Sequence, residues 1–199
     1  MNRFEKAVFF DVDTQIDFLD PQGALYVPGA EKIVDRVAAL NRFAAAHLAP
    51  VVSTMDAHAP DDPEFRDWPP HCVAGTPGQR KPEATLLEPR VIVPNRPGLP
   101  TVEGARQILL EKQALDCFTN VNLAALLDRL HRKECFVYGV VTEICVNRAA
   151  LGLLRAGRKV AIVTDAVKEL DAEKAAGALA EFTAAGGTLI TTPELFSAS

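Results

Sequence analysis

No apolar run in the 199-residue sequence approaches the roughly 20 residues that a bilayer span requires, so we expect no membrane association. A basic tract is also missing, and 21 basic against 26 acidic residues give a formal net charge of −5. This balance argues against nucleic acid or an anionic membrane as a partner. Met1-Asn2-Arg3 leads directly into a strand-like run, which is not the pattern of a signal peptide, and we expect a cytoplasmic protein.

The four cysteines, Cys72, Cys117, Cys135 and Cys145, show no CxxC spacing. They are typical of reduced thiols in a cytoplasmic protein, of which one can be reactive. Neither a GxGxxG motif nor a P-loop is found, which argues against dinucleotide and nucleoside triphosphate chemistry. Hydrophobic residues make up 48% and charged residues 24% of the chain, so the composition excludes wholesale disorder.

Short β-rich runs alternate with helical patterns along the chain. Residues 7–12 and 49–55 are nearly continuous apolar runs, typical of parallel strands that are covered on both faces. Further strands are expected at residues 90–93, 107–110, 135–140, 159–164 and 189–191, and helices at about 33–44, 120–130, 143–154 and 172–184. This alternation predicts an α/β fold with a doubly wound, mainly parallel sheet and helices on both of its faces.

We expect residues 1–199 to form a single domain with one elaborated loop at about residues 57–100. The loop holds most of the prolines and shows little periodicity. Long loops of this kind inside a compact domain are usually functional or disordered. Two histidines and the only tryptophan lie within it, which favours a functional loop.

Cys145 is the strongest candidate for a nucleophile. The segment 139–145 is expected to run from a strand into a helix, with Thr142 as the N-cap and Cys145 in the first helical turn. There the helix dipole and the free backbone N–H groups favour a thiolate, and the same N–H groups can hold an oxyanion. The alternative is a buried cysteine that packs as a small hydrophobic residue.

A thiol nucleophile also needs a base and groups that hold charge. Asp11, Asp13 and Asp17 crowd the end of the first strand, and ligands of open parallel sheets bind beyond the carboxyl ends of the strands. Each aspartate has the alternative role of a turn or cap residue. Lys112, next to Glu111, is on its own most simply explained as a solvated charge.

A second group of candidates lies in the elaborated loop. Asp56, His58, Glu64 and His71 offer the nitrogen and oxygen ligands that suit Zn²⁺, Fe²⁺ or Mn²⁺. Asp56 and His58 are two residues apart, so both point the same way if the backbone is extended. No regular metal-binding spacing is matched, and a polar surface loop is the alternative. Trp68 either stacks on a planar ligand or anchors the loop.

Five motifs occur along the chain in one order. They are DTQIDF at 13–18, DAH at 56–58, WPPHCVAGTPG at 68–78, Lys112, and GVVTEICV at 139–146. This order resembles the isochorismatase-like cysteine hydrolases, and among them most closely the nicotinamidases. The resemblance covers nearly the whole chain, and the WPPHCVxGTPG run together with DxH is specific to the metal-containing nicotinamidase branch.

The resemblance implies a role for each candidate residue. Catalysis would rest on a triad of Asp13, Lys112 and Cys145, with the backbone N–H groups of Val141 and Cys145 as the oxyanion hole and a cis peptide between Val140 and Val141. One divalent metal ion, with zinc favoured over iron or manganese, would be held by Asp56, His58, Glu64 and His71. Phe18 and Trp68 would flank the ring of the substrate.

The implied activity is hydrolysis of nicotinamide to nicotinate and ammonia through a cysteine thioester, as in NAD salvage. The partner would be a small aromatic amide, and family members often form homo-oligomers. The alternatives are another cysteine amidohydrolase, acting on a carbamoyl, ureido or short-chain amide, and a non-catalytic thiol or binding protein. Asp11 stands where relatives carry an aliphatic residue; if it lies close to Asp13, the two carboxylates can share one proton, and the role of Asp11 stays open. Ile144 stands where some relatives have histidine.

Overall fold

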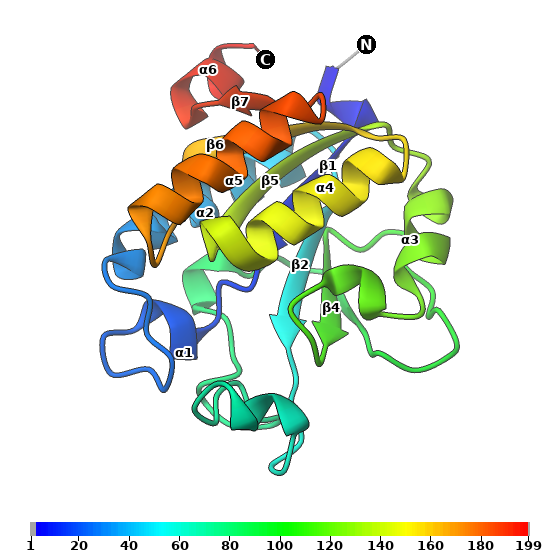
Figure 1. The fold of residues 1–199 in the computed structure, drawn as a ribbon. Coiled ribbons are helices and arrows are strands. Elements are labelled where there is room, and N and C mark those ends of the chain that lie inside the picture. The colour runs from blue at the N-terminus through cyan, green and yellow to red at the C-terminus, as the bar shows by residue number, and fades with distance from the viewer. Residues whose placement is uncertain (1–2, 199) are drawn as a thin grey trace.

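The computed structural model describes residues 3–198 and contains one seven-stranded sheet (Figure 1). Its spatial order is β3-β4-β2-β1-β5-β6-β7, and every neighbouring pair is parallel. The strands are β1 (Ala7–Val12), β2 (Val51–Asp56), β3 (Arg90–Val93), β4 (Gln107–Lys112), β5 (Glu134–Val140), β6 (Lys159–Lys168) and β7 (Thr188–Ile190). The predicted parallel sheet is confirmed, and each of the seven expected strands is present.

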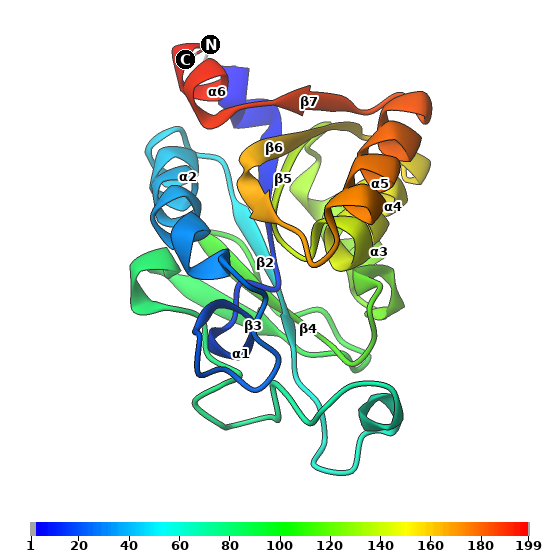
Figure 2. The ribbon, with the colours of Figure 1, turned by 60° about the vertical axis from the view of Figure 1, so that its left-hand side comes forward.

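Helices cover both faces of the sheet, as the sequence predicted (Figures 1 and 2). Helices α1 and α2, with α6 near the C-terminus, contribute to a hydrophobic core on one face, and α3, α4 and α5 contribute to the core on the other. The bounds are α1 (Ile16–Leu19), α2 (Val34–Ala46), α3 (Leu123–Leu130), α4 (Asn147–Arg155), α5 (Ala172–Ala184) and α6 (Thr192–Ser197).

The central strand β1 shows why the apolar runs are continuous. Successive side chains of a strand point to opposite faces, so Phe9 packs into one core and Phe10 into the other. Both side chains are fully buried. A strand with a helix layer on each side has no solvent face, and its sequence therefore lacks polar alternation.

Some boundaries differ from the expectation. The helix expected at 143–154 begins as a π-helical turn at Thr142–Val146 and continues as α4. Thr142 is not the N-cap as predicted: Val141 takes that position, and the buried Thr142 hydroxyl has no hydrogen-bond partner among the described residues. Helix α6 was not predicted, although Thr191 and Glu194 form a capping box at its start.

The first part of the elaborated loop follows β2 and lies beyond the carboxyl end of that strand (Figure 1), whereas its later part includes the edge strand β3. The loop contains short 3-10 helices at Pro63–Arg66 and Glu83–Thr85, and a single bridge joins His58 to Val73. The loop is therefore ordered around a few local turns rather than around a long helix or strand. Within residues 3–198, no helix has the length and apolar character needed to span a membrane.

Candidate active site

The candidate residues meet at the carboxyl edge of the sheet because of the strand order. From the central strand β1, the chain turns to β2 on one side, while β5 lies on the other side. Ligands of open parallel sheets bind at such a switch point. Asp13 directly follows β1, and Cys145 lies in the π-helical turn after β5. Asp56 and Lys112 end β2 and β4 and are register partners in the sheet.

Lys112 joins two of these carboxylates in the interior. Its Nζ lies 2.9 Å from Asp13 Oδ2 and 2.5 Å from Asp56 Oδ1. The lysine side chain is only 1% exposed, and both carboxylates are buried. Burial acts to lower the pKa of Lys112, but the charges of Asp13 and Asp56 outweigh it and raise that pKa well above its usual value. Lys112 is therefore a buried cation at neutral pH.

The two carboxylates on Lys112 differ in character. Burial raises the pKa of Asp13, and neighbouring Asp56 adds to this rise while Lys112 opposes it. For Asp56, burial is outweighed by Lys112 and His58, and the pKa is lowered. Asp13 therefore binds a proton more readily than Asp56 does. The Thr54 hydroxyl donates to Asp13 Oδ1 at 2.6 Å and fixes its orientation.

Cys145 is half-buried, whereas the other three cysteines are buried. Burial is the main cause that raises the pKa of Cys145 well above its usual value; Lys112 opposes this effect, and the hydrogen bond between the thiol and Asp13 adds to it. The expectation that the helix N-terminus favours a resting thiolate is therefore wrong, since burial and nearby carboxylates dominate. The structure brings Asp13, Lys112 and Cys145 together, with the thiol in its neutral form.

Asp56, His58 and His71 form a cluster of ligand atoms that all lie within 4.8 Å of one another. The Nε2 atom of each histidine is 3.9 Å from Asp56 Oδ2. His71 Nδ1 faces the carbonyl oxygen of Pro69 at 2.8 Å, and His58 Nδ1 lies 3.0 Å from the carboxylate of Asp62. Such outer contacts orient a histidine so that Nε2 faces a metal.

The cluster suits a divalent ion for a further reason. His58 is fully buried, and its Nε2 has no hydrogen-bond partner among the described residues. A buried polar atom without a partner is costly unless something else binds it. Glu64, the fourth predicted ligand, lies outside this cluster on the 3-10 helix Pro63–Arg66, although it lines the same pocket. Its pKa is raised by burial and by the charge of Asp56.

The DTQIDF motif holds the metal-ligand candidates in place through two side chains that had no assigned role. Gln15 accepts from the backbone N–H of Asp56 at 2.6 Å and donates to the Asp56 carbonyl at 2.9 Å. Asp17 Oδ2 accepts from the N–H of Cys72, next to His71, at 2.6 Å. A Cβ at Gly78 would lie 2.2 Å from the Asp17 carboxylate, which explains the glycine there.

The cysteine and the metal-ligand cluster face one pocket. Phe18 and Trp68, the predicted ring-binding residues, line it with Val141 and Cys145, and the Val140–Val141 peptide is cis as expected. The cavity is narrow, at about 40 Å³, and most of its lining is apolar. The sequence interpretation missed four other apolar residues that line the pocket, because isolated aliphatic residues carry no motif: Leu25, Val27, Leu115 and Leu170.

Asp11, whose role the sequence left open, has partners of its own apart from those of Asp13. Its carboxylate accepts from the hydroxyls of Thr14 at 2.5 Å and Ser53 at 2.8 Å, and it lies 3.3 Å from Lys81 Nζ. Asp11 is thus fully engaged by its own partners, while Asp13 is bound to Lys112. The backbone at Asp13 is left-handed, with φ at 51°, so the simple alternation of strand side chains ends there.

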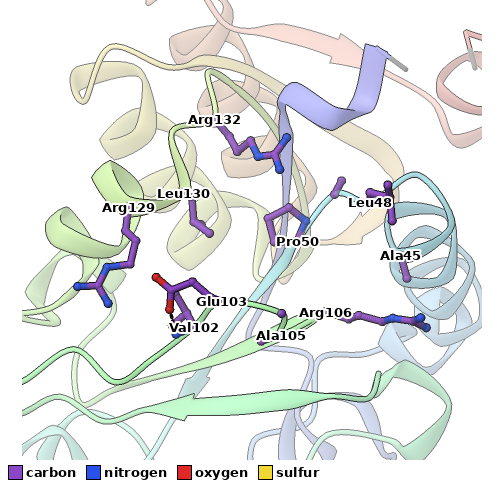
Figure 3. A pocket seen from close by; sticks show the side chains of 12 residues that line it. Ala45, Leu48, Pro50, Val102, Glu103, Ala105, Arg106, Arg129, Leu130 and Arg132 are labelled. Atoms are coloured by element: carbon purple, nitrogen blue, oxygen red, sulfur yellow. Dashed lines mark hydrogen bonds between the residues drawn. The ribbon is translucent and has the colours of Figure 1, made fainter. Parts of the chain in front are cut away.

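A wider hollow of about 380 Å³ lies at the opposite, amino-terminal edge of the sheet (Figure 3). It is lined mainly by small apolar residues, by Glu103, and by Arg106, Arg129 and Arg132. Figure 3 shows the three guanidinium groups pointing in different directions. None of its lining residues is a cysteine, histidine or lysine, so nucleophilic chemistry belongs to the smaller pocket.

Comparisons with known proteins show the family to which the chain belongs. The family model of the isochorismatase domain matches residues 7–194. The crystal structure of a pyrazinamidase from Pyrococcus horikoshii in complex with zinc is 31% identical, with a TM-score of 0.78, and the match covers 94% of this chain and 99% of that chain. A nicotinamidase/pyrazinamidase of Mycobacterium tuberculosis is 30% identical, with coverage of 90% of this chain and 95% of the relative.

A streptothricin hydrolase of Streptomyces noursei is 31% identical over 158 residues, which are 78% of this chain. The matched region is 47% of that relative, so the chain spans about half of its length. Relatives of similar identity therefore carry names that refer to different substrates.

Proposed function

Because the chain belongs to the isochorismatase family, we propose that it is a cysteine amidohydrolase that converts nicotinamide and water to nicotinate and ammonia. One observation carries the proposal: a half-buried thiol, a carboxyl group with a raised pKa and a buried ammonium meet beside an Asp-His-His cluster in one narrow pocket. An amide is a weak electrophile with a poor leaving group, so its hydrolysis needs both a strong nucleophile and a proton donor.

In the first half of the reaction, Asp13 removes the proton from the thiol of Cys145 as the sulfur attacks the carboxamide carbon. The raised pKa of Asp13 suits a group that must hold this proton. The backbone N–H groups of Val141 and Cys145 hold the oxyanion. Asp13 then donates its proton to the leaving nitrogen, which breaks the C–N bond, releases ammonia and leaves a thioester on Cys145.

In the second half, Asp13 takes a proton from a water molecule as its oxygen attacks the thioester carbon. The carbon–sulfur bond breaks, the acid leaves, and the proton returns to the sulfur of Cys145. Lys112 remains a cation throughout, because its pKa lies well above neutrality. Its charge stabilises the anion that passes between sulfur and carboxylate.

Asp56, His58 and His71 would hold one divalent ion, with Glu64 close enough to line the same pocket. When bound, the ion would supply a Lewis-acid contact for the ring nitrogen of a pyridine or pyrazine carboxamide. Phe18 and Trp68 would contact the ring of such a substrate. Phe18 also lies against the His71 ring, with centroids 5.4 Å apart, so ring binding and metal binding are adjacent.

The test is an ammonia-release assay with nicotinamide, pyrazinamide, acetamide, a carbamoylated amino acid and streptothricin. We expect the two aromatic amides to be turned over fastest. Cys145→Ala should abolish this turnover, whereas the control Cys135→Ala, which alters a buried thiol in the core, should keep it. Preference for the carbamoyl compound would favour the alternative substrate class, and preference for streptothricin would favour the activity named for the Streptomyces relative. Turnover that survives Cys145→Ala would refute the cysteine mechanism.

A further inference from the structure

Leu170 is an exposed leucine with an unusual position. It follows β6 directly before α5, and 45% of its surface is exposed although it lines the candidate active-site pocket. Among the exposed large hydrophobic residues of the described chain, only Leu170 lines this pocket. An apolar side chain at a pocket wall gains most when a ligand covers it. Leu170 therefore offers an apolar contact surface to a ligand that enters the pocket.

The backbone at Leu170 is held by a single side chain from another element. Glu143 Oε1 accepts from the N–H of Leu170 at 3.0 Å and from the N–H of Asp171 at 2.8 Å. Asp171 in turn caps α5 by accepting from the N–H groups of Glu173 and Lys174. The start of α5 and the Leu170 wall are thus tied to one carboxylate oxygen.

Glu143 itself lies in the π-helical turn that carries Cys145. Its neighbour Ile144 and Cys145 both line the pocket. Glu143 Oε2 is buried and has no hydrogen-bond partner among residues 3–198, so Oε1 carries the recorded hydrogen bonds of this carboxylate. The Glu143 side chain therefore joins the turn that carries Cys145 to the Leu170 segment, which also lines the pocket.

We propose that Leu170 is a specificity-determining residue for the ring of the substrate and that Glu143 is a positioning residue that holds it there. This inference rests on the proposed amidohydrolase function. The Leu170 side chain carries no nucleophilic or ionisable group, so it contributes binding energy rather than chemistry. Interactions that are equal in the ground state and the transition state change KM and leave kcat unchanged.

The first arm of the test truncates the leucine. Leu170→Ala should raise KM for nicotinamide by roughly fivefold to tenfold, the factor expected from losing part of a buried apolar contact, with kcat within about twofold. Acetamide, which has no ring, should show no change in kcat/KM. Leu189→Ala is the matched control, since Leu189 is 44% exposed on β7 and does not line the pocket.

The second arm removes the tether. Glu143→Ala should raise KM as Leu170→Ala does, and the double variant should show little further increase. Glu143→Gln should keep a KM near that of the wild type, because an amide oxygen still accepts hydrogen bonds. Amide hydrogen exchange provides a readout without catalysis: the N–H groups of Leu170 and Asp171 should exchange faster in Glu143→Ala and remain protected in Glu143→Gln.

The outcomes separate this inference from the proposed function. If the wild type releases ammonia from nicotinamide but Leu170→Ala matches Leu189→Ala, the role of Leu170 is refuted and the proposed function stands. If exchange at Leu170 and Asp171 is unchanged in Glu143→Ala, the tether is refuted whatever the activity. If the wild type hydrolyses no aromatic amide, the proposed function and the ring specificity fail together, and the exchange result still decides the tether.

Discussion

Replacing Lys112 with methionine tests the centre of the proposed site. The substitution keeps an unbranched side chain of similar length and removes the charge that lies 2.9 Å from Asp13 and 2.5 Å from Asp56. Removing one partner from a buried ion pair typically costs about 3–5 kcal/mol, because the remaining charge is buried and unpaired. For a chain of this size, each kcal/mol lowers Tm by about 2–4 °C, so we expect Tm to fall by roughly 6–20 °C.

The same substitution should also stop catalysis. Lys112 is the group that opposes the rise in the pKa of Asp13, so this pKa rises further when the ammonium is removed. A protonated Asp13 cannot accept the proton of Cys145. Loss of a general base typically lowers the rate by about 10²- to 10⁴-fold, and we expect kcat of Lys112→Met to fall within that range at neutral pH.

Lys81→Met is the matched control. Lys81 is a second buried lysine at the same edge of the sheet; its Nζ lies 3.3 Å from Asp11 and donates to the Thr14 hydroxyl at 2.9 Å. Urea unfolding should show comparable losses of stability in the two variants, and ammonia release should fall far less in Lys81→Met. Full activity of folded Lys112→Met at neutral pH, or equal inactivity of both variants, would refute the assigned role of Lys112.

Three other outcomes are expected. The activity, measured as log kcat/KM against pH, should rise through an acid limb centred above the usual pKa of an aspartate. The reason is that Asp13, whose pKa is raised, must lose its proton before it can act as a base. An acid limb at the ordinary aspartate pKa would contradict this. Iodoacetamide should modify half-buried Cys145 before any other thiol and faster as pH rises, as peptide mass spectrometry will report. Elemental analysis should find one divalent ion per chain, and markedly less in His58→Ala, whereas an unchanged metal content would exclude His58 as a ligand.

The fold could be predicted because its signal is local. Alternating apolar runs and helical periods identify the strands and helices, and crossovers between parallel strands leave few topologies. No such local pattern in the sequence indicates which residues far apart in the chain are in contact. Asp56 and Lys112 are neighbours only because β2 and β4 pair in one register, and nothing in the spacing of these residues specifies that register. For this pair, only the resemblance to a family predicted a common site.

The expectations from the sequence that the structure contradicts also have physical explanations. A helix N-terminus was expected to favour the Cys145 thiolate, but the dipole of one turn is weak beside burial and two nearby carboxylates. Thr142 has the chemistry of an N-cap, yet the π-helical turn places it one residue inside the helix. Leu170 has no sequence signal, because its position depends on the hydrogen bond that its backbone N–H donates to Glu143 in another element.

The two lysine–carboxylate pairs at this edge of the sheet explain why Asp13, and not Asp11, suits the role of base. Asp11 is surrounded by donors that engage both of its oxygens, from Thr14, Ser53 and Lys81. Asp13 follows the strand with a left-handed backbone, and its Oδ2 lies beside Lys112 without a recorded hydrogen-bond partner among the described residues. Burial without full hydrogen bonding leaves a carboxylate ready to bind a proton, and that is the property which the proposed chemistry requires of it.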